Sequence, residues 1–353
     1  AQTRGAAYEA TDRIALVSSF IASLLVGDYA PIDVSDGSGM NLLDIRSKKW
    51  AVHALKRTAP DLARRLGEPV ASHSVVGNIH GRFAIKYGFN FGCLVIAFSG
   101  DNPNSLAGLL LQRPGDVAIS LGTSDTMFGT TSRAAPSGVE GHVFANPIDP
   151  KAYMVMIVRK NGSLTREKVR DAHAGGSWEA FNETLKKTGP GNGGNIGLHV
   201  DQPEITPPLS KTGVFRRDGK GKKIDSFSPA EEVRAVAEGV FLSMRIHGAG
   251  IGLKPKSILA TGGASTNVEL IGIMSNVFGA PVFVGEQPNS AAVGAAYRAF
   301  HGWTCAKAGK FVPFAEVMSG VAPFRKAADP DAAAHKVYTS MLPAYERLEK
   351  EAG

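Results

Sequence analysis

Residues 257–300 read SILATGGASTNVELIGIMSNVFGAPVFVGEQPNSAAVGAAYRAF, and the order of elements within them decides the fold class. A short apolar strand at 257–260 runs into a Gly-Gly turn, and a helix is expected over 267–278. A second strand follows at 281–284 and a second helix over 291–300. Strands that alternate with helices predict an α/β layer built on parallel strands.

The same reasoning extends outward from this stretch. The apolar run at 93–98 (CLVIAF) predicts a buried parallel strand, and a helix is expected after it at 104–112. Further strands are expected at 116–122, 142–145 and 153–158. Further helices are expected at 8–29, 47–66, 229–251 and 331–350. Residues 185–225 are rich in Gly, Pro, Lys and Asn, and they predict a long excursion of loops.

Composition sets the broad class. The chain has 353 residues, which favours two domains, and 43% apolar with 20% charged residues is typical of a globular protein. The sequence contains no apolar run of about 18 residues, so a membrane span is not expected. Its two cysteines, Cys93 and Cys305, provide neither a disulfide framework nor zinc spacing, and they favour a reducing compartment such as the cytoplasm.

The net charge is +7, and part of it lies in one Gly-containing stretch at 216–223. A solvated loop is the simpler interpretation, because no aromatic residues interleave with these charges as they do in many nucleic-acid sites. We therefore expect no nucleic-acid partner. The nine histidines show no ligand spacing, so no metal held by His or Cys is expected. No pattern indicates an oligomeric state.

Three motifs carry chemistry, and the first is Gly100-Asp101-Asn102, at the end of the strand predicted at 93–98. A carboxylate at a strand end can accept a proton from a bound hydroxyl, as phosphoryl transfer to an alcohol requires. The alternative is that Asp101 only caps the following helix.

The second and third motifs are glycine turns at strand ends. Gly122-Thr123-Ser124 follows an apolar strand and offers backbone N–H groups and hydroxyls to a phosphate, although a plain β-turn fits equally well. Gly262-Gly263-Ala264 leads into a helix, and Asn267 could hydrogen-bond an adenine edge. The alternative there is a plain strand-to-helix turn with Ser265 or Thr266 as the N-cap.

Together these motifs resemble those of the FGGY carbohydrate kinases, members of the actin/hexokinase-like superfamily. The resemblance is carried in order by ALVSSF (15–20), SDGSGMNLLDI (35–45), FSGDNPNSLAG (98–108), SLGTSDT (120–126), KNGSLTREKVRD (160–171), GNGGNIG (191–197), ILATGGASTN (258–267) and NSAAVGAAYRAFHG (289–302). It spans nearly the whole chain. It is closer to the eukaryotic members that phosphorylate D-xylulose than to the other branches.

The resemblance implies a kinase that transfers the γ-phosphate of ATP to the terminal hydroxyl of D-xylulose, with Mg²⁺ bound with the nucleotide. Asp101 is similar to the family's catalytic base, and Asn102 to a sugar ligand beside it. Residues that resemble nucleotide ligands are Gly122, Thr123 and Ser124 in the phosphate loop, Gly262, Gly263, Ala264 and Asn267 in the adenosine turn, and Trp178, which flanks the nucleotide. For Trp178, a packing role is the open alternative.

The family's fold has two ribonuclease H-like domains, with the active site in the cleft between them. By resemblance, residues 1–113 form the C-terminal part of sugar-binding domain I, and residues 114–353 form nucleotide-binding domain II. Domain I is expected to be incomplete, because the Asp-x-Gly-Thr hairpin that opens family members is absent from this sequence. Two alternatives stay open: another sugar or polyol kinase of the family, and a truncated nucleotide-binding module without catalysis.

Overall fold

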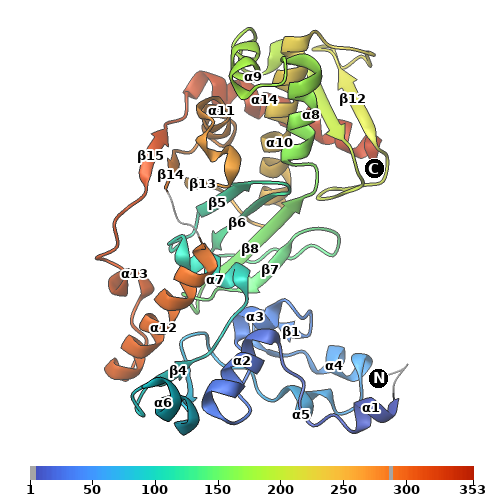
Figure 1. Cartoon of the computed structure of the whole chain (residues 1–353). Coiled ribbons are helices and arrows are strands. Elements are labelled where there is room, and N and C mark those ends of the chain that lie inside the picture. Colours follow the sequence, from blue (N-terminus) through green and yellow to red (C-terminus); the bar gives the residue numbers. More distant parts are fainter. Residues whose placement is uncertain (1–4, 286–288) are drawn as a thin grey trace. The chain divides into compact units, whose positions relative to one another are not determined.

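The computed structural model describes residues 5–285 and 289–353, which group into two compact units (Figure 1). Unit 1 contains residues 5–112, 143–154 and 289–322. Unit 2 contains residues 113–142, 155–285 and 323–353. The chain thus leaves unit 1 close to the predicted boundary at residue 113, but it returns twice, so each unit is assembled from separate segments of sequence.

Unit 2 is organised around a mixed sheet with the strand order β15-β14-β13-β5-β6-β8-β7. The strands are β5 (Asp116–Leu121), β6 (Asp125–Thr131), β7 (His142–Ala145), β8 (Tyr153–Arg159), β13 (Ser257–Thr261), β14 (Val282–Val284) and β15 (Arg325–Ala328). Strand β13 pairs in parallel with both β14 and β5, whereas β6 is antiparallel to β5 and β15 is antiparallel to β14. The predicted parallel layer is confirmed for β14, β13 and β5.

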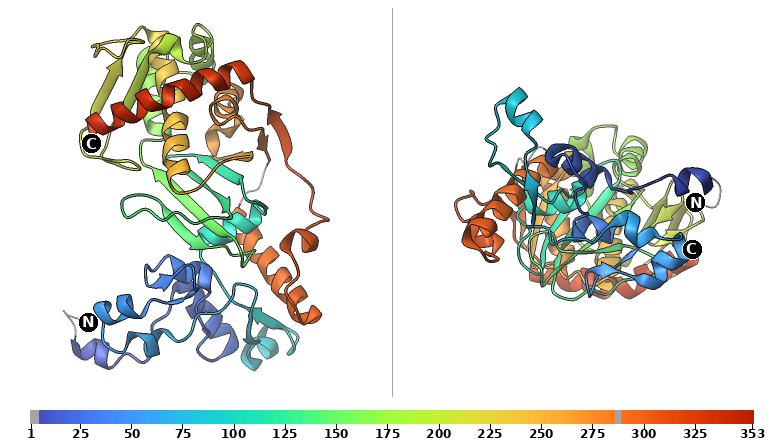
Figure 2. Two further views of the ribbon diagram at one scale, coloured as in Figure 1. Left: turned by 180° about the vertical axis from the view of Figure 1, so that it is seen from behind. Right: turned by 90° about the horizontal axis from the view of Figure 1, so that it is seen from below.

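The predicted long helices of unit 2 are also confirmed. Helix α10 (Pro229–Gly250) begins at Ser228 with a capping box that is completed by Glu231, and most of its side chains are buried. Helix α14 (Ala332–Ala352) packs against α10 and α11 (Val268–Phe278), and Figure 2 shows it running across the back of this unit. A helix buried on most faces explains why α10 lacks a strong polar stripe.

One prediction for unit 2 was wrong. Residues 185–225 are not only loops, because β9 (Ile196–Val200) and β12 (Gly213–Arg217) form an antiparallel hairpin. All five residues of β9 are buried, and this short apolar segment was masked by the polar composition around it. Within the basic stretch, Arg216 and Arg217 form ion pairs with Glu232 and Glu351, while the lysines are exposed, as a solvated loop predicts.

Unit 1 corrects three predictions. The helix expected at 8–29 is divided into α1 (Gly5–Glu9) and α2 (Val17–Val26), and the one expected at 47–66 becomes α4 (Val52–Thr58) and α5 (Leu62–Leu66), which Pro60 separates. The apolar run at 93–98 does form β4 (Leu94–Ile96), but β4 is antiparallel to β3 (Val75–Asn78) in a two-stranded sheet. An apolar run predicts burial, whereas the direction of its partner depends on the tertiary structure.

Two helices in unit 1 cross unusually closely. They are α7 (Asp101–Gly108) and α12 (Ser290–Ala308), which come from distant parts of the sequence. A Cβ atom on Gly294 would collide with the carbonyl oxygen of Asn104, and one on Gly108 with that of Ser290. Because glycine has no Cβ, the two backbones can touch, and this contact explains why α12 groups with unit 1.

Among the residues that the structure describes, no helix combines the length and apolar character needed to cross a membrane.

Candidate active site

The predicted phosphate loop is the turn between β5 and β6. Leu121 pairs with Asp125, so Gly122, Thr123 and Ser124 form a three-residue connection, and the two hydroxyl residues are exposed. The turn is held from one side by Ser163, whose backbone N–H donates to the carbonyl oxygen of Gly122 at 2.8 Å. The connection between β5 and β6 is therefore a short hairpin turn whose two hydroxyl residues are exposed.

A buried ion pair that the sequence did not reveal supports this hairpin. Arg166 lies on α8 (Ser163–His173), and its guanidinium contacts both carboxylate oxygens of Asp125, the residue that follows Ser124. Both side chains are almost fully buried. Burial raises the pKa of Asp125, and the hydrogen bonds and charge of Arg166 act in the opposite direction. The pair fixes the base of the turn to α8.

The predicted adenosine turn follows the neighbouring strand, β13. Gly262 has a φ of 82°, and a Cβ atom there would lie 2.6 Å from the carbonyl oxygen of Leu121. Only glycine meets both requirements, so the two ligand loops leave adjacent parallel strands in direct contact. The 3₁₀ turn η2 (Gly263–Thr266) then leads to α11.

The N-cap of α11 is Asn267, not Ser265 or Thr266 as the alternative interpretation held. The side-chain oxygen Oδ1 of Asn267 accepts from the backbone N–H groups of Glu269 and Leu270 at 3.1 and 3.2 Å. The side-chain nitrogen Nδ2 of Asn267 donates to the side-chain oxygen Oδ1 of Asn182 at 2.9 Å. The helix cap therefore uses the acceptor that the sequence analysis assigned to an adenine edge.

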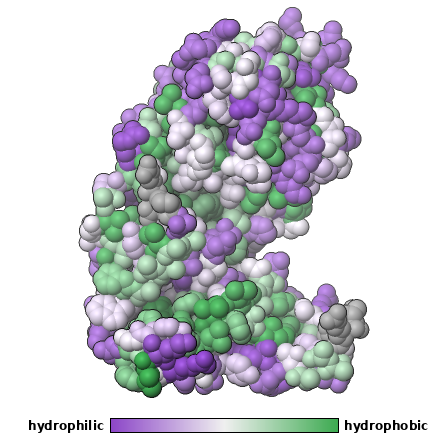
Figure 3. All heavy atoms as spheres, viewed as in Figure 1, coloured by the Kyte–Doolittle hydropathy of each residue, from purple (hydrophilic) through white to green (hydrophobic). Residues whose placement is uncertain are grey.

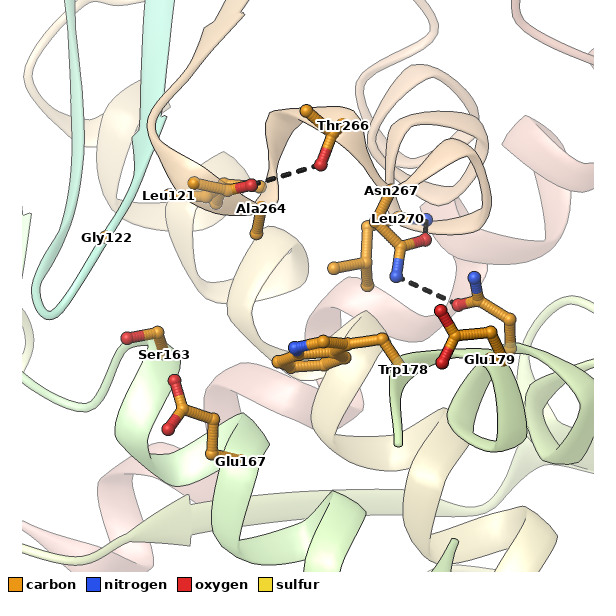
Figure 4. A pocket seen from close by; sticks show the side chains of 12 residues that line it. Leu121, Gly122, Ser163, Glu167, Trp178, Glu179, Ala264, Thr266, Asn267 and Leu270 are labelled. Carbon is orange, nitrogen blue, oxygen red and sulfur yellow. Dashed lines mark hydrogen bonds between the residues drawn. The ribbon is translucent and has the colours of Figure 1, made fainter. Parts of the chain in front are cut away.

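A cavity of about 550 Å³ opens between these elements (Figure 4). Its lining includes five predicted nucleotide ligands: Gly122, Trp178, Gly263, Ala264 and Asn267. It also includes side chains that the sequence analysis did not single out: Ser163, Glu167, Glu179 and Asn182. Thr123, Ser124 and Gly262 are not among the lining residues. The spacing of Ser163 and Glu167, four residues apart at the start of a helix, is the signal that could have identified one wall.

Trp178 projects into this cavity from the first residue of α9 (Trp178–Leu185). The guanidinium carbon of Arg170 lies 4.8 Å from the centre of the indole ring, and Arg170 does not line the cavity. The edge of Phe181 meets the indole at a centroid distance of 5.3 Å. The indole that lines the cavity thus has a cation and an aromatic ring as its neighbours.

Asp101, in unit 1, is the exposed first residue of α7, and the N-cap is Gly100. The alternative interpretation of Asp101 as the N-cap is therefore wrong. One carboxylate oxygen of Asp101 accepts from the backbone N–H of Asn102 at 2.8 Å. The other has no hydrogen-bond partner among the described residues.

The loop that carries Asp101 is held by a buried arginine, which the sequence analysis also missed. Arg298, on α12, donates to the side chain of Asn104 at 2.9 Å and to the carbonyl oxygens of Ser72 and Ala97 at 3.0 and 3.3 Å. Asn104 in turn donates to the carbonyl oxygen of Ser99 at 3.1 Å. These bonds fix the end of β4 and the start of α7 on either side of Asp101.

A second carboxyl group, Asp36 of α3 (Val34–Ser38), approaches the same loop. A Cβ atom on Gly100 would lie 2.6 Å from one of its oxygens, so the absence of a side chain at Gly100 allows this close approach. Burial raises the pKa of Asp36, a hydrogen bond from Ser18 lowers it, and the charges of Asp33 and Asp101 raise it further.

Comparisons with known proteins agree with this arrangement. Residues 117–303 match the model of the FGGY family of carbohydrate kinases, C-terminal domain. The chain is 49% identical over 347 residues to the xylulose kinase of Mus musculus, covering 98% of this chain and 62% of the mouse protein. It is 48% identical over 330 residues to xylulose kinase 2 of Arabidopsis thaliana, covering 90% of this chain and 59% of that protein. The chain thus spans about three fifths of the length of these curated relatives.

Solved structures show the same fold at lower identity. The xylulose kinase of Rhodospirillum rubrum superimposes with a TM-score of 0.80 at 20% identity, covering 99% of this chain and 70% of that one. The Plasmodium falciparum glycerol kinase with ADP superimposes with a TM-score of 0.70 at 16% identity, covering 94% of this chain and 65% of that one. The expected actin/hexokinase-like fold class is confirmed by this likeness. With the family model covering more than half of its length, the chain belongs to the FGGY family of carbohydrate kinases.

Proposed function

We propose that this protein is an ATP-dependent kinase that phosphorylates the terminal hydroxyl of D-xylulose. The observation that supports the proposal is the cavity of unit 2, whose lining includes Gly122 of the β5–β6 turn, Gly263 and Ala264 of the glycine turn, and Trp178. The choice of sugar rests on the relatives from mouse and Arabidopsis thaliana, which are named xylulose kinases.

In this proposal, unit 2 binds the nucleotide. Trp178 stacks on the base, Gly263 and Ala264 let it approach the backbone, and Gly122, Thr123 and Ser124 donate to the phosphates. Donors that are fixed before the substrate arrives stabilise the charge of the transferring phosphoryl group without further reorganisation. The Asp125–Arg166 pair keeps the hairpin in place for this role.

Asp101 supplies the base. Its free carboxylate oxygen accepts the proton of the sugar's terminal hydroxyl as that oxygen bonds to the γ-phosphorus. The bond from the γ-phosphorus to the bridging oxygen breaks, and ADP leaves with the electron pair. Asn102, the next residue, would hold a neighbouring sugar hydroxyl. The polar clamp of Arg298 and Asn104 keeps Asp101 from moving away from the attacking oxygen.

Magnesium would enter bound to the phosphates of ATP, where it neutralises charge. Among the residues that the structure describes, no three His, Cys, Asp or Glu side chains gather as a metal site, so the proposal assigns the ion no ligand from this chain. Cys93 and Cys305 are free thiols, which supports a cytoplasmic location.

The test is to express the complete reading frame and to measure ADP release with D-xylulose, D-ribulose, glycerol and gluconate. We expect the highest kcat/KM with D-xylulose. A clear preference for another sugar would overturn the choice of substrate, and no release with any of them would overturn the kinase assignment.

A further inference from the structure

His247, close to the C-terminal end of α10, lies between two carboxylates from different parts of the chain. Its Nδ1 is 2.9 Å from Oε1 of Glu140, and its Nε2 is 2.9 Å from Oε2 of Glu349. Glu140 belongs to residues 132–141, which connect β6 to β7, and Glu349 lies on α14. His247 thus connects three parts of unit 2 through one ring.

The geometry indicates which protonation state the ring has. A neutral imidazole carries one N–H group, and an ionised carboxylate can only accept a hydrogen bond. With both carboxylates ionised, both contacts of His247 are hydrogen bonds only when both ring nitrogens carry a proton. Burial lowers the pKa of His247, but hydrogen bonds and charge from Glu349 and Glu140 prevail and raise the pKa above its usual 6.5.

The carboxylate on α14 has partners besides His247. Ser243 donates to Oε1 of Glu349, and Nη1 of Arg159 lies 3.8 Å from the same oxygen. Glu346, on the same helix, adds a further negative charge that acts on His247. Glu349 therefore keeps partners in unit 2 when the ring is neutral.

The carboxylate of Glu140 has less support. Its Oε2 is buried without a hydrogen-bond partner among the described residues, so this group depends on the bond between Oε1 and His247. The segment around it is mostly exposed, with 74% of Val139 accessible. The chain passes from unit 2 to unit 1 at Val143, three residues after Glu140. The bond at Glu140 therefore acts on the segment by which the chain leaves unit 2.

We infer that protonated His247 is a latch that holds residues 132–141 against α10, and that loss of one ring proton releases them. A neutral ring keeps one N–H, which cannot serve two carboxylates. Because the folded-state pKa of His247 is raised, the contribution of the latch is complete below the unfolded value of about 6.5, and it is lost as the pH rises through the folded-state value. The inference does not depend on the proposed kinase function.

The first measurement is the protonation state of His247. Nitrogen NMR of the protein with labelled histidine distinguishes a ring with two N–H groups from a neutral tautomer, and the loss of a signal in His247→Gln assigns it. We expect both ring nitrogens to carry protons at pH 6 and one proton to leave as the pH is raised to 9. A ring with one N–H at pH 6 would overturn the inference.

Hydrogen exchange of the backbone amides of residues 132–141 measures the release. Rates of variant and wild type are compared at the same pH, so the chemical exchange rate cancels. At pH 6, His247→Gln should exchange about 10-fold faster in this segment, because its side chain has a single donor nitrogen. At pH 9 the two proteins should agree. His53→Gln, at an exposed histidine of unit 1, is the matched control and should match the wild type at both values. A ratio that is the same at pH 6 and pH 9 would contradict the latch.

Glu140→Gln separates the latch from a general loss of packing, and it provides the test if His247→Gln does not fold. The new amide can donate or accept, so it can bond to the ring in either protonation state. Exchange in residues 132–141, divided by the chemical rate, should lose its dependence on pH in this variant, while amides of α10 stay protected. A pH dependence that persists without the Glu140 carboxylate would overturn the inference, because the release would then run through another group.

Discussion

The two units hold their candidate site residues by different means. In unit 2, the two glycine loops proposed for the nucleotide leave paired parallel strands, with Thr261 opposite Ser120, and buried helix α10 belongs to the same unit. In unit 1, β3 and β4 form a two-stranded sheet, and the Asp101 loop is fixed by one buried arginine and a helix crossing. The positions of loops on a central sheet depend on many apolar contacts, whereas the position of the Asp101 loop depends on a few hydrogen bonds.

The two units also differ in how far their apolar side chains are buried. Helix α2 exposes Val17, Phe20, Ile21 and Leu24, with 81%, 53%, 40% and 49% of their areas accessible, and their spacing places them on one helical face. Figure 3 shows hydrophobic atoms gathered over this part of the unit. In unit 2, the central strands are buried almost throughout.

The largest effect should come from Asp101→Asn, which removes the proposed base and leaves the nucleotide cavity untouched. Turnover should fall by about 10²–10⁴-fold, the usual contribution of a positioned base. The measurement is kcat of the complete reading frame with D-xylulose, together with Kd for ADP. Near-normal kcat would exclude Asp101 as the base. A large loss of ADP affinity would show that Asp101 also affects nucleotide binding, which the proposal does not expect.

Arg298→Met tests whether the clamp dominates the stability of unit 1. Removing one partner of a buried charged network costs about 3–5 kcal/mol, because Asp33 and three acceptors lose their donor. We expect the free energy of unfolding of unit 1 to fall by this amount, measured by hydrogen exchange of unit 1 amides, while unit 2 amides stay protected. Arg113→Met, at a largely exposed side chain, is the control and should change little. Equal loss of protection in both units would contradict a local clamp.

Glu232 should make unit 2 sensitive to acid. Its burial raises its pKa, but hydrogen bonds and charge from His199 and Arg216 prevail and lower the pKa to about 2. A lowered folded-state pKa contributes stability above the unfolded value of about 4.5, and this contribution is lost as the pH falls toward 2.

The corresponding measurement is urea unfolding of the wild type and of Glu232→Gln between pH 5 and pH 3. We expect the difference in unfolding free energy between them to shrink by about 1–2 kcal/mol over this range. A difference in unfolding free energy that does not vary with pH would show that the charge of Glu232 contributes nothing to stability.

The smallest effect is expected on the exposed face of α2. The double change Phe20→Ser and Leu24→Ser should alter the free energy of unfolding by no more than about 0.5 kcal/mol, because both side chains are already in water. The double change should also reduce light scattering by concentrated solutions of the protein, because it removes exposed apolar surface. Phe241→Ser in α10 is the contrast, since that ring is buried and its loss should cost about 3–5 kcal/mol. A similar cost at both sites would mean that α2 is covered in solution.

The sequence by itself determined the parts that depend on local pattern. The strand and turn chemistry of 257–267 predicted a strand, a glycine turn and a helix, and the structure has all three. Three residues of the two glycine motifs, Gly122, Gly263 and Ala264, also line the cavity of unit 2, whereas their role with a nucleotide stays a prediction. Composition, in contrast, hid strand β9 among polar neighbours.

Only the tertiary structure decided which distant residues meet. Arg298 lies 194 residues from Asn104, and Arg166 lies 41 residues from Asp125, so no spacing rule connects them. The commitment of Asn267 to its cap and to Asn182 likewise followed from where α9 and α11 pack. A side chain's chemical capacity is set by its type, but the share of it left for a ligand is set by the neighbours that the fold supplies.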